Sequence, residues 1–240
     1  MRIESALRLI FPPACIACGA RVDSDFGLCP DCWPEVRFLT GLVCDACGAP
    51  LPGEEGDGAV QCDDCLASPR PWARGRSAVL YAGRGRDLIL QFKHGDRLDL
   101  ARPMAGWLAR AGAPLLAPDM LIAPVPLHWR RFFTRRYNQS ALLARALARA
   151  TGQEDCPDLL VRHRATASQE GRTREERAAN LAGALSVNRR QRERIKGRAV
   201  LIVDDVMTSG ATFAEATRAC LQAGALSVSV LALARVAKDA

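Results

Sequence analysis

The chain has 240 residues, a formal net charge of +7 at pH 7 and 49% apolar residues, enough to bury the core of an α/β domain plus a small module. No apolar run approaches the ~20 residues of a membrane span. Residues 1–10 lack the uninterrupted apolar region of a signal peptide. We therefore expect a cytoplasmic protein without membrane insertion, in which paired cysteines bind metal more often than they form disulfides.

Charge is divided sharply along the chain. Residues 1–70 hold 5 Lys and Arg against 11 Asp and Glu, whereas residues 71–240 hold 28 against 15. Only the larger part is therefore predicted to bind anions. Its cations are mostly arginine, whose planar guanidinium group suits phosphate. Because solvated arginines are common, this excess alone is weak support for nucleic-acid binding.

Eight of the ten cysteines form four Cys-x2-Cys pairs within the first 70 residues: Cys15 and Cys18, Cys29 and Cys32, Cys44 and Cys47, Cys62 and Cys65. Zinc prefers four thiolates in a tetrahedron, so two structural zinc sites are predicted. The pairs repeat as CIACGA, CPDCW, CDACGA and CDDCL, and a glycine (Gly19, Gly48) follows only the first pair of each unit. That asymmetry favours sequential pairing, with Cys15/18/29/32 on one zinc and Cys44/47/62/65 on the other. An interleaved pairing stays open. Each unit resembles a zinc ribbon.

From Trp72 onward the pattern changes to alternating strands and helices. Strands are expected at residues 77–81, 120–125, 159–161, 199–203 and 227–233, and helices at 86–93, 100–111, 138–150 and about 213–223. This alternation predicts an α/β fold with a mostly parallel sheet and helices on both faces. Pro69 and Pro71 mark a linker at residues 67–75. We thus expect a Cys-rich module at 1–70 and the α/β domain at 71–240.

The stretch RAVLIVDDVMTSGAT, residues 198–212, carries the strongest functional signal. Asp204 and Asp205 follow a buried apolar strand, and the segment from Thr208 to Thr212 offers hydroxyls, a glycine and the start of a helix. Backbone N–H groups at a helix N-terminus bind phosphate. The predicted ligand is a phosphorylated molecule with hydroxyls or a divalent cation. A response-regulator-like or Rossmann strand end is the alternative, but neither requires DD followed by TSGAT.

These residues resemble the fingerprint of the type I phosphoribosyltransferases. The resemblance implies that Asp204 and Asp205 are the catalytic acids, which bind the ribose hydroxyls of phosphoribosyl pyrophosphate (PRPP) with magnesium. It also implies that the 5-phosphate is bound by the loop residues Val206, Met207, Thr208, Ser209, Gly210, Ala211 and Thr212. No base lies beside Cys156 or Cys220 in the sequence, so neither is assigned as a nucleophile.

Three further segments carry cations that could reach this ligand. The loop PVPLHWRRFFTRRYNQ contains Arg130, Arg131, Arg135 and Arg136, for which the resemblance implies pyrophosphate contact; a solvated basic turn is the alternative. Residues 162–180 are polar and correspond to the mobile loop that closes over substrate in that family. Lys93 lies in the KHGD segment, which is either a helix-ending turn or a cation facing the pocket.

The cysteine pairs, KHGD, PVPLHWRRFFTRRYNQ, RATASQEGRTREERAANLAGAL and VDDVMTSGAT occur in the order typical of the ComF family, and nearly the whole chain resembles it. The resemblance implies a link to natural transformation, with single-stranded DNA and DNA-uptake proteins as partners. It also implies phosphoribosyl transfer to an unknown acceptor with loss of pyrophosphate. One departure is Arg135-Arg136, where the family has arginine-glycine. A non-catalytic protein that binds single-stranded DNA or senses PRPP through the same basic cleft stays open.

Overall fold

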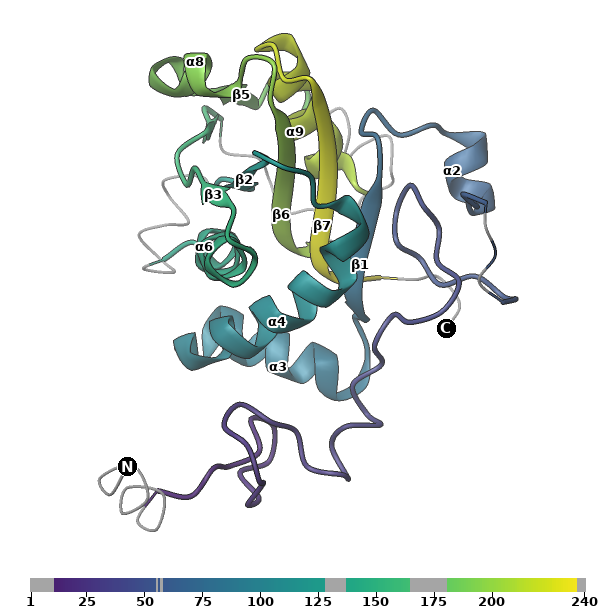
Figure 1. Cartoon of the computed structure of the whole chain (residues 1–240), viewed down its shortest axis with the longest axis vertical. Coiled ribbons are helices and arrows are strands. Elements are labelled where there is room, and N and C mark those ends of the chain that lie inside the picture. The colour runs from purple at the N-terminus through teal and green to yellow at the C-terminus, as the bar shows by residue number, and fades with distance from the viewer. Residues whose placement is uncertain (1–10, 55, 57, 128–136, 165–180, 237–240) are drawn as a thin grey trace.

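The computed structural model describes residues 11–54, 56, 58–127, 137–164 and 181–236 (Figure 1). Its centre is a five-stranded sheet in the order β1-β7-β6-β2-β3. The strands are β1 (Gly75–Leu80), β2 (Leu121–Pro124), β3 (Glu154–Asp155), β6 (Ala199–Met207) and β7 (Ser227–Arg235). Every neighbouring pair is parallel, as the alternation of strands and helices predicts.

Helices cover both faces of this sheet, because side chains of successive strand residues point to opposite sides. Leu201 and Val203 of β6 are buried with α3 (Gly83–His94), α4 (Ala101–Gly112) and α6 (Gln139–Thr151). Val200 and Ile202 are buried with α9 (Ala211–Gln222) on the other face. The predicted α/β class with helices on both faces is therefore confirmed. Within the described segments, no helix has the length and apolarity needed to cross a membrane.

The strand expected at residues 159–161 does not join the central sheet. It forms β4 (Leu160–Arg162), which pairs antiparallel with β5 (Leu185–Val187) in a separate two-stranded sheet. The remaining short elements are α2 (Asp63–Ala67), η1 (Leu98–Leu100), η2 (Ala113–Leu115), η3 (Arg189–Gln191) and α8 (Arg192–Ile195). Strands of two or three residues are too short to show a periodicity, which is why β3 and β5 escape sequence analysis.

The two cysteine-rich units pack on different parts of the α/β domain. The first unit, at the purple end of the chain, lies beneath α3 and α4 in Figure 1, and its Ile16 and Val36 join the core on that face. The second unit lies beside β1, and its Cys44, Cys47 and Cys65 belong to the same core as α9. The sequence repeat therefore does not produce equivalent packing.

Candidate functional site

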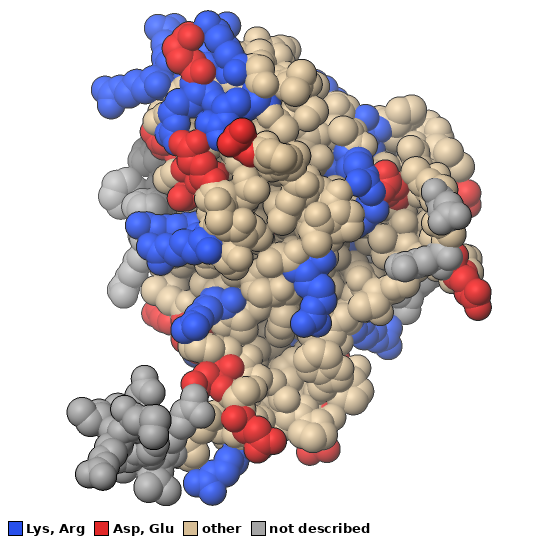
Figure 2. All heavy atoms as spheres, viewed as in Figure 1, with Lys and Arg blue, Asp and Glu red and all other residues tan. Residues whose placement is uncertain are grey.

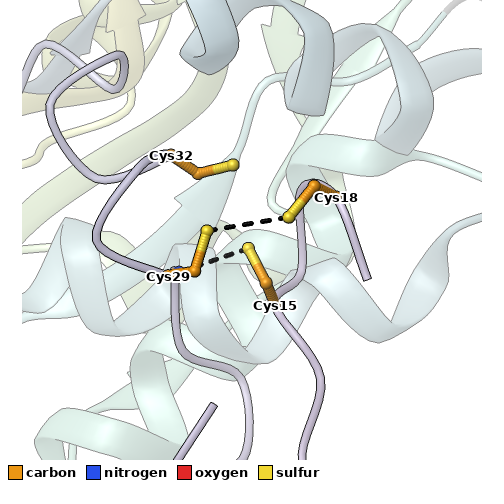
Figure 3. Close-up of side chains that lie close together, drawn as sticks. All are labelled: Cys15, Cys18, Cys29 and Cys32. Carbon is orange, nitrogen blue, oxygen red and sulfur yellow. Dashed lines mark hydrogen bonds between the residues drawn. The ribbon is translucent and has the colours of Figure 1, made fainter. Parts of the chain in front are cut away.

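Each group of four cysteines converges on one point. The sulfur atoms of Cys15, Cys18, Cys29 and Cys32 lie within 4.8 Å of one another, as do those of Cys44, Cys47, Cys62 and Cys65. Figure 3 shows the first four side chains directed toward one another. The Cys18–Cys29 and Cys47–Cys62 sulfur distances are 3.6 Å and 3.7 Å. A zinc tetrahedron with ~2.3 Å bonds separates its sulfurs by about 3.8 Å, so both tetrads fit zinc ribbons paired sequentially.

The repeated glycine shapes the first turn of each unit. Gly19 and Gly48 both adopt a positive φ, of 79° and 67°, which L-residues rarely occupy. Within each unit a backbone amide also points at a sulfur: Cys29 N–H donates to Cys15 Sγ and Cys62 N–H to Cys44 Sγ, each at 3.3 Å. The two halves of the sequence repeat therefore share one local geometry that suits a bound metal.

The two acids lie in the carboxyl-terminal part of β6, which runs on to Met207 instead of ending at Val203 as expected. Oδ1 of Asp204 accepts hydrogen bonds from Ser140 Oγ at 2.7 Å and from the Asp205 amide at 2.9 Å. Oδ2 of Asp205 lies 3.1 Å from Lys93 Nζ, and both side chains are largely buried. The Lys93 ammonium group thus lies beside Asp205, and the KHGD segment also ends α3, with Gly95 as its C-cap.

Burial, followed by the negative charge of Asp205, raises the pKa of the Asp204 carboxyl to about 7. The hydrogen bond from Ser140 and the charge of Lys93 act in the opposite direction, because both favour the ionised form. Asp204 therefore titrates near neutral pH, and a cation bound beside it would favour its ionised form.

Ser140 is positioned by the cap of α6. Asn138 is the N-cap: its side-chain oxygen accepts from the Ser140 amide at 3.1 Å, and its amide nitrogen donates to Val125 O at 3.1 Å. The cap thereby fixes the start of α6 to the chain leaving β2. The role of Ser140 was missed in the sequence, because its partner is 64 residues away.

Tyr137 and Gln139, which flank the Asn138 cap, also hold the end of α3, which carries Lys93. Gln139 Nε2 donates to Lys93 O at 3.1 Å, and Tyr137 Oη donates to Phe92 O at 3.2 Å. Gln139 is almost fully buried, so its amide is committed to this contact. The segment 137–140 therefore positions two groups that contact the acids: the hydroxyl of Ser140 contacts Asp204, and the ammonium of Lys93 contacts Asp205.

The predicted phosphate loop lies beside Asp204. Residues 206–213 line one small pocket together with Asp204. Val206 and Met207 are still in β6, and the Met207 side chain is buried, so only its backbone can face a ligand. Gly210 is the N-cap of α9 with φ +80°, and α9 begins at Ala211, two residues earlier than expected. The loop proper is Thr208, Ser209 and Gly210.

Two arginines that sequence analysis did not single out contact the carbonyl groups of this loop. Arg70 Nη1 donates to Ser209 O at 2.8 Å. Arg235 Nη1 donates to Thr208 O at 2.7 Å and to Met207 O at 3.2 Å. Arg70 lies in the predicted linker and Arg235 ends β7, so no local pattern marks either one.

Several predicted residues are not covered. Arg130, Arg131, Arg135 and Arg136 lie outside the described residues, as does most of the segment 162–180. Cys156 and Cys220 are buried, and burial raises the pKa of Cys156 to about 11. Neither of these thiols has the environment of an activated nucleophile.

Comparison with known proteins finds a family match for the cysteine-rich part of the chain and another for the α/β part. The double zinc ribbon domain matches residues 6–66, and the phosphoribosyl transferase domain matches residues 138–240. The chain is 35% identical over 218 residues to the DNA utilization protein YhgH of Salmonella typhi, covering 88% of this chain and 92% of the relative. It is 33% identical over 216 residues to YhgH of Escherichia coli K12, covering 88% and 91%. It is 29% identical over 228 residues to Competence protein F of Haemophilus influenzae, covering 92% and 96%.

Proposed function

The chain belongs to the ComF family, and from this membership and the geometry at the end of β6 we propose that it binds PRPP with magnesium and transfers the phosphoribosyl group. One observation carries the proposal: Asp204 and residues 206–213 line a single pocket where a parallel strand ends and a helix begins. A helix N-terminus favours phosphate, and the neighbouring carboxylates favour hydroxyls or a cation.

The loop would hold the 5-phosphate. Ser209 and Gly210 lie at the start of α9, whose first amides have no partner within the helix. The hydroxyls of Thr208 and Thr212 border the same pocket and can donate to phosphate oxygens. The three-residue loop leaves little room beyond one phosphate group, which favours a terminal phosphate over one within a polynucleotide chain.

Asp204 and Asp205 would bind the ribose 2- and 3-hydroxyls. Asp205 lies 3.1 Å from the ammonium group of Lys93, whereas burial raises the pKa of Asp204 to about 7. Magnesium, when bound with PRPP, supplies positive charge that neutralises the pyrophosphate leaving group. The acid pair keeps the ribose hydroxyls oriented while the bond at C1 breaks.

The proposed reaction is substitution at ribose C1. A lone pair of the acceptor forms the new bond to C1, the bond from C1 to the pyrophosphate oxygen breaks with its electrons, and the acceptor proton passes to solvent. Arg130, Arg131, Arg135 and Arg136 are proposed to contact the pyrophosphate. The protein contributes positioning and electrostatic stabilisation, and no described side chain near the pocket is arranged as a covalent nucleophile.

Titration calorimetry tests the binding part of this proposal. With magnesium, PRPP should bind one site per chain, and ribose 5-phosphate should bind the same site more weakly because it lacks pyrophosphate. Omitting magnesium should weaken PRPP and leave ribose 5-phosphate nearly unchanged. No heat and no competition between the two ligands would contradict the assignment. Pyrophosphate release with candidate acceptors then tests turnover.

A second candidate function is binding of single-stranded DNA. Figure 2 shows lysine and arginine side chains gathered at the end of the molecule where α8 lies. Arg189, Arg190 and Arg192 are exposed there, and none has an ion-pair partner among the residues that the structure describes. Two relatives carry the names DNA utilization protein and Competence protein F, which supports a cytoplasmic role in handling imported DNA, together with DNA-uptake proteins. A salt-dependent affinity for single strands would support it.

A further inference from the structure

Two arginines connect the second cysteine tetrad to the phosphate loop. Arg70 Nε donates to Cys65 Sγ at 3.3 Å while its Nη1 donates to Ser209 O at 2.8 Å. Arg235 Nη2 lies 3.9 Å from Cys47 Sγ while its Nη1 donates to Thr208 O at 2.7 Å. Each guanidinium group therefore joins one sulfur of Cys44/47/62/65 to one carbonyl of the loop.

These contacts decide which way the loop amides point. In a trans peptide the C=O group and the following N–H group point in opposite directions. Holding Thr208 O and Ser209 O toward the arginines turns the N–H groups of Ser209 and Gly210 away from the tetrad. Those are the amides that a phosphate at the start of α9 would bind. The arginines thus contact the side of the loop that faces the tetrad and orient the amides on the opposite side, where the ligand would bind.

The packing behind the loop leaves little freedom. Trp72 is 4% exposed, and its indole N–H donates to Ala46 O in the second unit. The Arg70 guanidinium lies 5.6 Å from the centre of the Trp72 ring. A Cβ atom at Gly210 would lie only 2.9 Å from that ring. The loop is therefore pressed against the second unit, and a shift of the unit must move the loop.

Among the residues that the structure describes, the first tetrad has no comparable bridge. Cys15, Cys29 and Cys32 form a small cluster of their own, separate from the core that includes the loop residue Met207. In the described residues, that unit contacts the α3 face, for example from Arg97 to Ile16 O and from Arg84 to Glu35, and the chain that follows it pairs with β1 at Phe38 and Val79. The two units consequently differ in what they touch, although their local geometry is the same.

Resting on the proposed function, we propose that Arg70 and Arg235 are positioning residues that make phosphate binding at the loop depend on metal in the second tetrad. A metal-bound cysteine is a thiolate, which accepts strong charge-assisted hydrogen bonds from arginine. Without metal the four sulfurs are no longer held together, so the positions of Cys65 Sγ and Cys47 Sγ beside the two arginines are not fixed. Loss of metal from Cys44/47/62/65 would then release both arginines and let the loop carbonyls turn.

Arginine substitution is the first test, with a matched control. Arg70→Met removes one of the two bridges and leaves that of Arg235. Arg74→Met removes a different link between the second unit and the domain, since Arg74 joins Asp45 at 2.8 Å to Pro114 O at 2.8 Å. Arg70→Met should weaken ribose 5-phosphate and PRPP by at least about 5-fold, while pyrophosphate binding stays unchanged. Arg74→Met should alter none of these affinities by as much as 2-fold. Arg70→Lys, which keeps one donor, should recover part of the loss.

Metal release is the second test, because coupling between two sites is reciprocal. Saturating ribose 5-phosphate should slow the release of one of two zinc ions to a chelator and leave the other unchanged. In Arg70→Met, which keeps only the Arg235 bridge, ribose 5-phosphate should slow the release of that ion less than in the wild type. Wild-type protein that binds neither PRPP nor ribose 5-phosphate would overturn the proposed function and this inference with it. If the wild type binds ribose 5-phosphate and Arg70→Met binds it with the same affinity, the inference alone is overturned. The same holds if ribose 5-phosphate does not change the rate of zinc release from the wild type.

Discussion

Ser140 Oγ donates a 2.7 Å hydrogen bond to Oδ1 of Asp204, which joins the N-terminus of α6 to the end of β6. The acceptor is the acid whose pKa is raised by burial and by its neighbour Asp205. Because the hydroxyl favours the carboxylate form, it opposes that rise. Ser140 therefore sets the pH at which Asp204 becomes able to hold a ribose hydroxyl or a cation.

Replacing this serine should shift the pH dependence of ligand binding. In the wild type, affinity for PRPP with magnesium should fall as the pH drops below about 7, where Asp204 takes up a proton. Ser140→Ala should raise the pKa of Asp204 and move this midpoint to higher pH, while Ser140→Thr keeps the hydroxyl and should stay near wild type. Calorimetry from pH 5.5 to 8.5 measures the midpoint. Identical midpoints in alanine and serine proteins would show that the contact does not tune the acid.

Asp204→Asn should separate binding from stability. An acid whose pKa is raised in the folded state contributes stability at low pH that is lost as the pH climbs from about 4 to about 7. The neutral asparagine escapes that loss, so the variant should gain thermal stability relative to wild type between pH 5 and pH 8, while magnesium-dependent PRPP binding disappears. Thermal midpoints at both pH values provide the measurement. A large fall in thermal midpoint with PRPP binding retained would mean that Asp204 is structural.

The local part of the site is visible in the sequence, whereas its supports are not. A buried strand, Asp204, Asp205 and a hydroxyl-rich loop are neighbours in the chain, so their pattern predicts a phosphate site directly. Arg70 reaches Ser209 across 139 residues and Arg235 reaches Cys47 across 188. Such contacts depend on how the second cysteine unit packs against the α/β domain, and the spacing of residues in the sequence does not show this packing. Pro69 and Pro71 suggest a linker, and nothing in that composition shows that the arginine between them contacts the loop.

The cysteine repeat illustrates the same limit. Spacing and Gly19 or Gly48 correctly favour sequential tetrads, because ligand geometry is local. The difference in packing between the units comes from what each one meets. A Cβ atom at Gly48 would lie 2.6 Å from the Ser77 amide in β1, whereas a Cβ atom at Gly19 would meet nothing within 4 Å. Only the three-dimensional arrangement separates these two glycines.

Alanine substitution of these glycines therefore forms a matched pair. Both glycines have positive φ, so backbone strain alone should lower the free energy of unfolding of each alanine variant by about 1–2 kcal/mol. Gly48→Ala must also push the second unit away from β1, so its thermal midpoint should fall further than that of Gly19→Ala. Its affinity for ribose 5-phosphate should fall as well, because the loop rests on that unit. Equal losses in both variants would indicate that the second unit does not rest on β1 in solution.

Metal analysis should find two zinc ions per chain. All eight cysteine sulfurs fall into two tetrads whose spacings suit tetrahedral zinc. Cys18→Ala should lower the content to about one ion and leave PRPP affinity within 2-fold, because no described residue bridges the first tetrad to the loop. Cys62→Ala should also lower it to about one ion but weaken PRPP. A metal-free protein with full PRPP affinity would remove any role for zinc at this site.

The DNA-binding alternative can be tested by comparing two groups of arginines. Neutralising Arg189, Arg190 and Arg192 removes three exposed charges near α8, and each lost phosphate contact should reduce the log-log salt slope of single-strand binding by about 0.7. A second variant neutralises the four arginines proposed to contact pyrophosphate, Arg130, Arg131, Arg135 and Arg136. PRPP affinity should stay unchanged in the first variant and fall in the second, because only these four arginines are proposed to contact pyrophosphate.

A third protein, with Thr208 and Thr212 both changed to alanine, completes this comparison. It lacks hydroxyls that border the phosphate pocket and retains every arginine, so it should lose PRPP and keep any affinity for DNA. Fluorescence anisotropy with a labelled single strand at several salt concentrations gives both affinity and slope. DNA binding that persists with an unchanged slope in both arginine variants would place the DNA site elsewhere. DNA binding lost together with PRPP in the threonine variant would instead mean that the strand end occupies the phosphate loop.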